Sequence, residues 1–336
     1  MDIMSGAIST GKYPWYDDRI ERLPPKHAVP KEDHEDRSEL RATPKKIYGY
    51  LCQNVWKQEE AKKTASIIMY NCLQGIKSNA MFVGASGSGK TYLWRCLKQI
   101  FWDRIEIVDG SSLTQDGWKG STKWKDLLRS PIFHSGDKNT VLVIDEVDKM
   151  LIPKYSNGNE NVSHSIQAEG LTMLEGTHVN IKDGYSSYEV DTAKISYVMC
   201  GAFSSKAHDV AEKSSGARIG FGAAPKPAQP YARPFGASEL LEFGVMPEFM
   251  GRVQRIVNLQ PMTADDYYQM TASFGTVLRH IRQQYGADVR LTPEKRRELA
   301  ELAYKDGLGV RGMENQIRQL VDDARFDDCE RQCFEF

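Results

Sequence analysis

The chain has 336 residues, of which 26% are charged and 40% hydrophobic, and its formal net charge is -1. This length suits about two domains of roughly 100 to 200 residues each. The balance of charge excludes a global electrostatic attraction to nucleic acid or anionic membrane, although it leaves room for a local basic lining. Bulk charge therefore identifies no partner, and we expect neither a nucleic acid nor a membrane as one.

The sequence contains no signature of export. No apolar run approaches the roughly 18 residues that a membrane-spanning helix needs. The first residues, MDIMSGAISTGKYPWYDD, lack the basic-then-apolar order of a secretory signal. Six cysteines are scattered without a C-x-x-C pair, which argues against a zinc knuckle and against a disulfide framework. We therefore expect a soluble, cytoplasmic protein with free thiols.

The N-terminal residues 1–43 form a polar tail, because their composition is too rich in proline and charge to bury a core. Regular structure is predicted to begin at Thr43 and Pro44, a helix N-cap residue followed by proline at the first helical position. A second helical pattern follows in QEEAKKTASIIMYNCLQGI. The chain thus enters its first domain through helices.

Residues 44–260 alternate short apolar runs with helical stretches. The apolar runs are AMFVG, RIEIVDG, TVLVIDEV and KISYVMC. Near-continuous apolar strands separated by helices predict a doubly wound parallel sheet, hence an α/β domain. A long loop, GARIGFGAAPKPAQPYARPFGA, is of the kind that is functional or disordered. Residues 261–336 keep only helical periodicity and predict a small helical domain without strands.

A phosphate loop is predicted after the first strand. The segment GASGSGKT fits G-x-x-x-x-G-K-[ST] between a strand and a helix, a context that favours phosphate binding over a glycine-rich turn with an incidental lysine. Its glycines let backbone N–H groups face phosphates, its lysine reaches the β and γ oxygens, and its threonine holds Mg²⁺. The predicted nucleotide-binding residues are Gly84, Ala85, Ser86, Gly87, Ser88, Gly89, Lys90 and Thr91.

Two acidic residues follow the strand VLVI. Asp145 and Glu146 lie at the carboxyl end of that strand, where open α/β sheets bind ligands. Alone they could be a solvated helix start. With the phosphate loop, Asp145 is predicted to hold Mg²⁺ and Glu146 to polarise the attacking water. Asp148 and Lys149, one turn on, are predicted to be surface or interface charges.

Several blocks resemble those of the hexameric AAA+ protein unfoldases, and the ClpX-like group more closely than the HslU-like group. These blocks run from TPKKIYGYL to the final helix and include NVWKQEEAKK, SLTQDGWKG, LTMLEGT, FGVMPEFMGR and GVRG. The resemblance implies the AAA+ form of the P-loop NTPase fold, ATP and Mg²⁺ at the nucleotide site, and a homohexameric ring.

The resemblance also implies roles for residues outside the phosphate loop. Arg252 in PEFMGR corresponds to the arginine finger that reaches a neighbour's γ-phosphate, and Arg311 in GVRG to the sensor-2 residue of the helical domain. For both, a plain surface arginine is the alternative. Val55 and Trp56 correspond to the residues beside adenine, although a tryptophan that anchors a helix is the alternative there. Cys200 stands where the family has the polar sensor-1 residue.

Two further segments correspond to loops that contact polypeptides. Trp118 and Lys119, in GWKG, stand where the family has the pore loop that grips the substrate, with Lys119 in place of an aliphatic residue. A tryptophan buried under the sheet is the alternative. Ile219, Gly220 and Phe221 resemble the tripeptide that docks on a ClpP-like peptidase ring, and a loop folded over its own core is the alternative.

The sequence departs from the resembling family in three places. No CxxC pair precedes Cys52, so the N-terminal zinc-binding domain has no counterpart. The stretch from Thr177 to Asp191 is too short for the basic-aromatic loop that receives substrates. The chain also stops soon after its last helix, where the family continues into strands. These differences bear on substrate delivery and on ring stability.

We therefore predict an ATP-dependent protein unfoldase and translocase whose homohexameric ring threads polypeptides into a separate ClpP-like peptidase, since the chain has no protease signature. One alternative is a remodelling ATPase that separates protein complexes without a peptidase, in a phage or mobile-element setting. A second is a nucleotide-switched DNA-loading ATPase. Glu146 and Arg252 favour turnover over a passive switch, and the lack of a basic helix-turn-helix argues against DNA loading.

Overall fold

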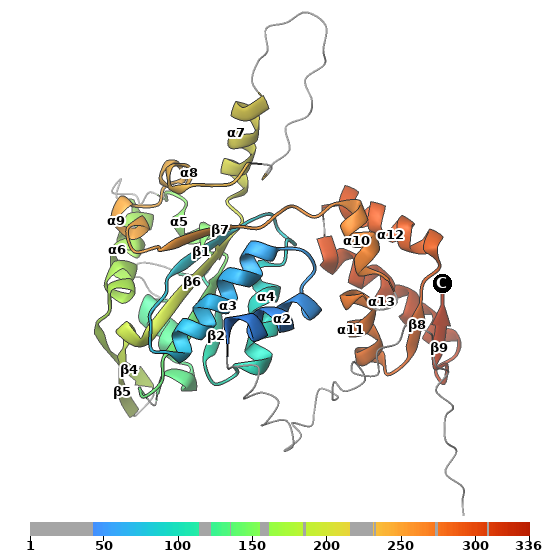
Figure 1. Ribbon diagram of the computed structural model, residues 1–336, viewed down its shortest axis with the longest axis horizontal. Helices are drawn as coiled ribbons and strands as arrows, with labels where there is room; N and C mark the ends of the chain where they lie inside the picture. Colours follow the sequence, from blue (N-terminus) through green and yellow to red (C-terminus); the bar gives the residue numbers. More distant parts are fainter. Residues whose placement is uncertain are drawn as a thin grey trace, which may run out of the picture.

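The computed structural model describes residues 43–113, 122–134, 136–154, 161–183, 186–215, 231, 233–272, 275–307 and 309–336. Figure 1 shows an α/β region followed by a smaller, mainly helical C-terminal region. One connecting segment between β7 (Arg255–Asn258) and α10 (Ala264–Met270) joins the two regions. The boundary predicted at residues 260 and 261 lies in this segment.

Five parallel strands form the central sheet in the order β2-β3-β6-β1-β7. All residues of β1 and β6 are buried, as are the first five of β3. The apolar runs of the sequence are therefore nearly continuous because helices cover both faces. The predicted doubly wound parallel sheet is confirmed, and β7 adds an edge strand that the sequence analysis did not predict. The strands are β1 (Ala80–Val83), β2 (Ile105–Asp109), β3 (Thr140–Asp145), β6 (Ile195–Gly201) and β7 (Arg255–Asn258).

Two separate apolar cores lie on the two faces of the sheet. Side chains of β1 alternate between them, with Ala80 and Phe82 in one core and Met81 and Val83 in the other. The first core is completed by α2 (Pro44–Asn54), α3 (Glu59–Leu73) and α4 (Lys90–Ile100), which Figure 1 shows together on one side. The second is completed by α5 (Asp148–Leu151), α6 (Val162–Glu175), α7 (Ser204–Ser215), α8 (Ala237–Phe243) and α9 (Pro247–Met250).

The predicted start of the first helix is confirmed. Thr43 has an extended backbone, and its hydroxyl accepts a hydrogen bond from the N–H of Lys46 at 3.3 Å. Pro44 occupies the first helical position, where its missing N–H has no partner to lose. The chain after the polar tail therefore enters α2 through a standard cap.

Two parts of the α/β region differ from the pattern read in the sequence. A hairpin of β4 (His178–Asp183) and β5 (Ser186–Asp191) stands between α6 and β6, although its polar, alternating sequence was not predicted as strands. The stretch KWKDLLRS is helical but forms the 3-10 helix η2 (Trp124–Leu128), and Trp124 donates its indole N–H to the carbonyl of Ile166 at 2.8 Å. Two other 3-10 helices are η3 (Pro131–Phe133) and η4 (Thr192–Lys194).

The C-terminal region is helical but also contains two short strands, so the prediction of no strands after Pro261 was wrong. Strands β8 (Asp288–Arg290) and β9 (Cys333–Glu335) pair in parallel, and Val289 and Phe334 are their buried residues. Three-residue strands give too short an apolar pattern to be recognised. Around them pack α10 (Ala264–Met270), α11 (Thr276–Tyr285), α12 (Pro293–Lys305) and α13 (Gly309–Asp327).

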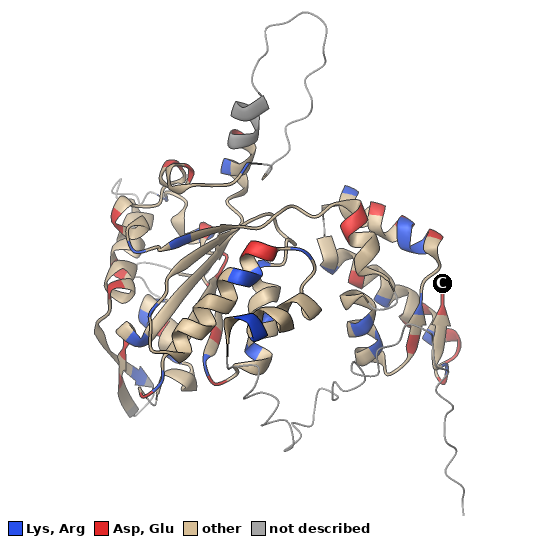
Figure 2. Cartoon of the chain, viewed as in Figure 1, with Lys and Arg blue, Asp and Glu red and all other residues tan. Residues whose placement is uncertain are grey.

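The surface and the thiols agree with the composition. Figure 2 shows basic and acidic residues interspersed over both regions, as a net charge of -1 leads one to expect. All six cysteines are free, as predicted. Among the helices of the described ranges, none is long and apolar enough to cross a membrane. The polar tail of residues 1–42 lies outside these ranges.

Candidate functional site

The segment from Gly84 to Thr91 connects the carboxyl end of β1 to the first turn of α4. Gly87 and Gly89 have φ angles of 76° and 96°, a left-handed backbone that favours glycine. At Gly84, a Cβ atom would lie 2.8 Å from the Cβ of Leu259. The loop therefore needs its glycines both for backbone conformation and for close packing.

The amino end of α4 is suited to an anion. Gly89 offers no capping side chain, and the first turn of this 11-residue helix contains no acidic residue. The hydroxyl of Ser88 is buried, and it has no hydrogen-bond partner within the described part of the chain. Uncapped N–H groups and an unpartnered buried hydroxyl at a helix N-terminus fit the oxygens of a phosphate.

Lys90 lies inside this loop with only 8% of its surface exposed. Its ammonium donates to the carbonyl of Gly84 at 2.6 Å and to that of Ala85 at 2.9 Å. Burial lowers the pKa of Lys90, and nearby carboxylates such as that of Asp145 oppose that effect. A phosphate anion would favour the charged form of this lysine, so the residue fits a nucleoside triphosphate.

Thr91 and Asp145 meet at the carboxyl edge of the sheet. The Thr91 hydroxyl donates to Oδ2 of Asp145 at 2.6 Å, and Oδ1 accepts from the backbone N–H of Glu146 at 3.1 Å. Hydroxyl and carboxylate oxygens are ligands that Mg²⁺ takes beside water and phosphate oxygens. Within the described ranges, no cluster of three His, Cys, Asp or Glu side chains forms a metal site by itself. The pair therefore fits an Mg²⁺ ion shared with a nucleotide.

Glu146 follows Asp145 in an exposed turn before α5. Its φ angle is 54°, a left-handed conformation that costs a non-glycine residue roughly 1–2 kcal/mol. Strained backbone of this kind is found where a side chain must be presented in a particular direction. The carboxylate thus lies beside the candidate Mg²⁺ site and is accessible to water.

Cys200 is buried near the end of β6, next to Phe82 of β1. Burial, together with the charge of Asp145, raises the pKa of its thiol, while Lys90 opposes the shift. The thiol is therefore neutral at physiological pH. A small, weakly polar group thus lies within electrostatic range of Lys90 in the phosphate loop.

Asp148 is not the surface charge that the sequence analysis predicted. Only 4% of its surface is exposed, and its Oδ2 accepts a hydrogen bond from the backbone N–H of Phe203 at 3.3 Å. Phe203 itself has a φ of 51° in the turn after β6. Asp148 therefore fastens the turn after β6 to the helix after β3. Lys149 is exposed, as predicted.

The segment after α2 separates the two residues predicted beside adenine. Val55 is buried in the core under α2, whereas Trp56 is 40% exposed. The indole N–H of Trp56 donates to Oδ1 of Asp266 at 3.1 Å, and the ammonium of Lys57 donates to Oδ2 at 2.9 Å. Burial raises the pKa of Asp266, but these bonds and those from Thr263 outweigh it and lower the pKa overall. A carboxylate of the C-terminal region is thus held by the α/β region.

Gln58 connects the phosphate loop to the linker between the regions, which sequence reasoning missed. Its amide nitrogen donates to the carbonyl of Ser88 at 3.1 Å and to that of Gln260 at 2.8 Å, and its oxygen accepts from the N–H of Gln260 at 2.8 Å. Lys57 and Gln58 have left-handed φ angles of 56° and 63°. A polar residue just before a helix carries no sequence signal for such a bridge.

The start of α13 approaches the phosphate loop from the C-terminal region. A Cβ atom on Gly87 would lie 3.4 Å from the Cα of Gly309. Arg311 is two residues further along and exposed. A second contact joins the regions nearby, because the Tyr92 hydroxyl lies 3.2 Å from Nε2 of His280. Arg311 is therefore carried by a segment that contacts the phosphate loop.

Arg252 lies at the amino ends of the strands, whereas the phosphate loop lies at their carboxyl ends. It precedes β7, whose Arg255 pairs with Ala80, the first residue of β1, whereas the phosphate loop follows the last. A four-residue strand spans about 13 Å. The guanidinium is half-exposed, and both Nε and Nη2 donate to Oε1 of Glu175, at 3.1 and 2.5 Å. Arg252 is thus on the far side of the sheet from its own chain's phosphate loop.

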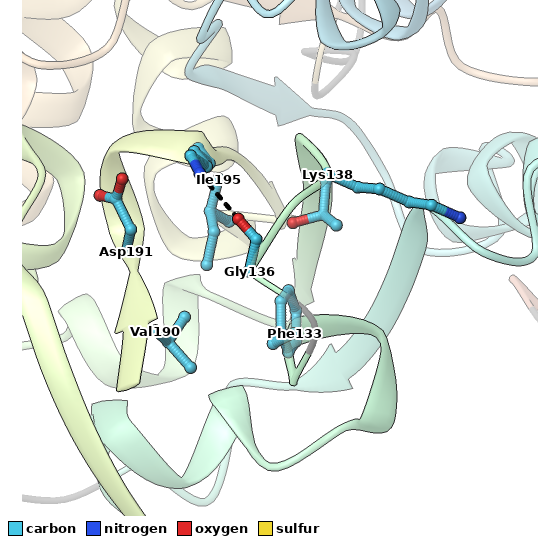
Figure 3. A pocket seen from close by; sticks show the side chains of 8 residues that line it. Phe133, Gly136, Lys138, Val190, Asp191 and Ile195 are labelled. Atoms are coloured by element: carbon cyan, nitrogen blue, oxygen red, sulfur yellow. Dashed lines mark hydrogen bonds between the residues drawn. The ribbon is translucent and has the colours of Figure 1, made fainter. Parts of the chain in front are cut away.

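A small pocket near that far edge contains none of the predicted site residues. Figure 3 shows it between the segment around Phe133 and Gly136, the end of β5 and the start of β6, and Lys194 closes it by donating to the carbonyl of Gly136 at 2.7 Å.

Other predicted residues lie outside the described ranges, namely Trp118, Lys119, Ile219, Gly220 and Phe221.

Comparison with known proteins agrees with this geometry. A family model described as AAA domain (Cdc48 subfamily) matches residues 76–256. The chain is similar to the ATP-dependent Clp protease ATP-binding subunit ClpX of Treponema denticola, with 27% identity over 332 residues, 87% of this chain and 79% of the relative. It is also similar to ClpX 2 of Wolinella succinogenes, with 25% identity, 84% of this chain and 77% of the relative. Matches of this extent include more than the α/β region alone.

Proposed function

The chain belongs to the AAA domain (Cdc48 subfamily) family and is ClpX-like, and on this premise we propose that it is an ATP-dependent protein unfoldase and translocase. In this proposal six copies form a ring in the cytoplasm, hydrolyse ATP between subunits, and thread polypeptides into a separate ClpP-like peptidase. The observation that carries the proposal is the similarity to ClpX proteins over 87% and 84% of the chain.

The chemistry follows from the carboxyl edge of the sheet. Lys90 and the N–H groups of the loop bind the phosphates, and Thr91 and Asp145 hold Mg²⁺, which neutralises phosphate charge when bound. Glu146 polarises the attacking water, because its carboxylate is exposed beside them. Arg311 reports the nucleotide to the C-terminal region.

A closed ring is supported by the position of Arg252. This residue lies at the opposite edge of the sheet from the phosphate loop that follows β1, so it cannot neutralise the γ-phosphate of its own chain. An arginine supplied by a neighbour requires a head-to-tail interface that repeats around a ring. The polypeptide contacts are proposed at Trp118 and Lys119, and the peptidase contact at Ile219, Gly220 and Phe221, on the resemblance alone.

The direct test mixes the purified protein with ATP, a ClpP-type peptidase ring and a tagged, folded fluorescent reporter. Wild type should destroy the reporter only when ATP and peptidase are both present. Glu146→Gln should bind ATP but hydrolyse it at least about 100-fold more slowly, the usual loss on removing a general base. Phe221→Ala should retain ATP hydrolysis but lose reporter degradation. Phe326→Ala, which removes another phenylalanine, 92% exposed on α13, is the matched control and should degrade normally.

The outcomes separate the rival functions. Loss of reporter fluorescence without cleavage of the reporter by the added peptidase would favour a remodelling ATPase that works alone. Undiminished ATP hydrolysis by Glu146→Gln would contradict the assignment of the catalytic carboxylate. Native mass measured in the presence of ATP tests the hexamer.

A further inference from the structure

A single buried asparagine holds the two segments that carry Arg252 and Glu175. Asn79, just before β1, is 4% exposed. Its amide nitrogen donates to the backbone carbonyl of Arg252 at 3.2 Å and to that of Leu174 at 3.4 Å, and its oxygen accepts from the N–H of Tyr197 at 3.1 Å. The side chain of Asn79 therefore bonds both to Arg252 and to Leu174, the residue that precedes Glu175.

The backbone next to Asn79 adds a second fastening. The N–H of Gln254 donates to the carbonyl of Asn79 at 3.0 Å, and the N–H of Asn79 donates to Oε1 of Gln254 at 2.7 Å. Both the carbonyl and the N–H of Asn79 thus bond the segment before β1 to Gln254, in the segment before β7. The Cα positions of Arg252 and Glu175 are set by rigid structure, so only their side chains remain to be oriented.

The ion pair supplies that orientation. Both hydrogen bonds from Arg252 end on one oxygen, Oε1 of Glu175, and both use the Nε and Nη2 edge of the guanidinium. A guanidinium has five N–H donors in a fixed fork, and three of those of Arg252 have no acceptor among the residues that the structure describes. Glu175 can therefore fix the direction of the fork without consuming it.

We propose that Glu175 is the positioning residue for Arg252: it holds the guanidinium at the amino edge of the sheet so that its free donors meet a phosphate of the neighbouring subunit. The inference rests on the proposed function, because only a ring brings that phosphate within reach. It assigns no contact with the nucleotide to Glu175 itself. A guanidinium that is already held in one orientation loses less conformational freedom when it meets the phosphate than one that rotates freely.

The test measures ATP hydrolysis by the full chain at saturating ATP and as a function of ATP concentration. Glu175→Ala should lower kcat about tenfold and change KM for ATP less than about twofold, because the carboxylate orients a group that acts in the transition state. Glu175→Gln keeps the oxygen acceptor and should recover part of the loss. Arg252→Ala should be slower than either, and Glu175→Ala added to Arg252→Ala should produce no further loss.

Glu298→Ala is the matched control. It removes the carboxylate that pairs with Lys295 at 3.0 Å on α12, and kcat should remain that of wild type. A similar fall of kcat in this variant would overturn the proposal, because loss of any surface ion pair would then suffice. Additive losses in Glu175→Ala and Arg252→Ala would overturn it too, and so would wild-type kcat in Glu175→Ala when Arg252→Ala is slow. Equal rates for wild type and Arg252→Ala would instead contradict the arginine finger of the proposed function.

Discussion

The two edges of the central sheet are built in different ways. At the carboxyl edge, one continuous segment from Gly84 to Thr91 supplies the phosphate loop, and backbone conformation dominates. At the amino edge, residues far apart in sequence meet through side chains, because Arg252 bonds to Glu175, 77 positions away, and to Asn79, 173 positions away. The first edge is a local motif, and the second exists only in the folded chain.

This difference teaches what each edge can be asked to do. A backbone loop recognises phosphate wherever the segment folds, since its donors are in the main chain. The geometry of a side-chain cluster depends on the position of every element that contributes to it, so it changes when the packing of those elements changes. We therefore expect mutations at the carboxyl edge to abolish chemistry in the same subunit, and those at the amino edge to affect the neighbour.

The largest expected effect tests that division directly. Arg252→Ala and Glu146→Gln should each lower kcat, by about 10³-fold for the arginine, the lower end of the range for arginine fingers. An equimolar mixture should recover activity, because some junctions join an intact site to an intact arginine. With random, independent junctions the recovery is about a quarter of the wild-type rate.

The doubly mutated chain Glu146→Gln/Arg252→Ala is the control for this mixture. Combined with Glu146→Gln alone it should remain inactive, because no subunit then has a working site. A mixture of the two single variants that stays as slow as its components would contradict action between subunits.

A smaller effect is expected on stability at the amino edge. Asn79→Ala removes three hydrogen bonds, two of them buried and the one to Arg252 partly buried, so the free energy of unfolding should fall by about 3 kcal/mol. Urea denaturation followed by circular dichroism measures it. Asn71→Ala is the control, since the Asn71 side chain donates to the Ser78 hydroxyl at 3.0 Å and its one such bond within the described ranges should be worth about 1 kcal/mol. Equal losses would show that the three hydrogen bonds of the Asn79 side chain stabilise the fold no more than one.

The smallest effect concerns Lys77, whose ammonium donates to the carbonyls of Met173 at 3.3 Å and Thr192 at 2.9 Å. Burial lowers the pKa of Lys77 to about 8, against an opposing effect of Asp191. Above that pH the unfolded chain binds more protons than the folded chain, so the free energy of unfolding rises with pH until the unfolded lysine also titrates.

The measurement compares wild type with Lys77→Met in urea at pH 7.5 and pH 9.5. The difference between them should shift in favour of wild type by about 1 kcal/mol, since solvent screens a partly exposed group. A difference that is flat over this range, or one that shifts toward the variant, would contradict the lowered pKa.

The carboxyl edge was predictable from sequence because glycine spacing restricts backbone conformation. The strand, loop and helix around Lys90 follow from one segment, and the ClpX-like resemblance is confirmed by the matched relatives. Asp148 was misread because α5 has only four residues, too few for a pattern that separates buried from exposed faces.

The amino edge was only partly predictable. Arg252 could be found by its resemblance to a known segment, but nothing in LTMLEGT marks Glu175 as its partner. Asn79 precedes a strand, as many polar residues do, and its three partners come from three separate segments of the chain. Tertiary contacts of single side chains leave no periodic trace in the sequence, and they became visible only with the fold.

Lys57 places thermostability and domain coupling in opposition. Its left-handed backbone would be relaxed by glycine, with a gain of roughly 1 kcal/mol. Glycine, however, has no ammonium to hold Asp266 and the carbonyl of Pro261, so the linker would lose two of its fastenings. Relief of the backbone strain would therefore be offset by the loss of these contacts, and the strain at Lys57 accompanies a side chain that ties the C-terminal region to the α/β region.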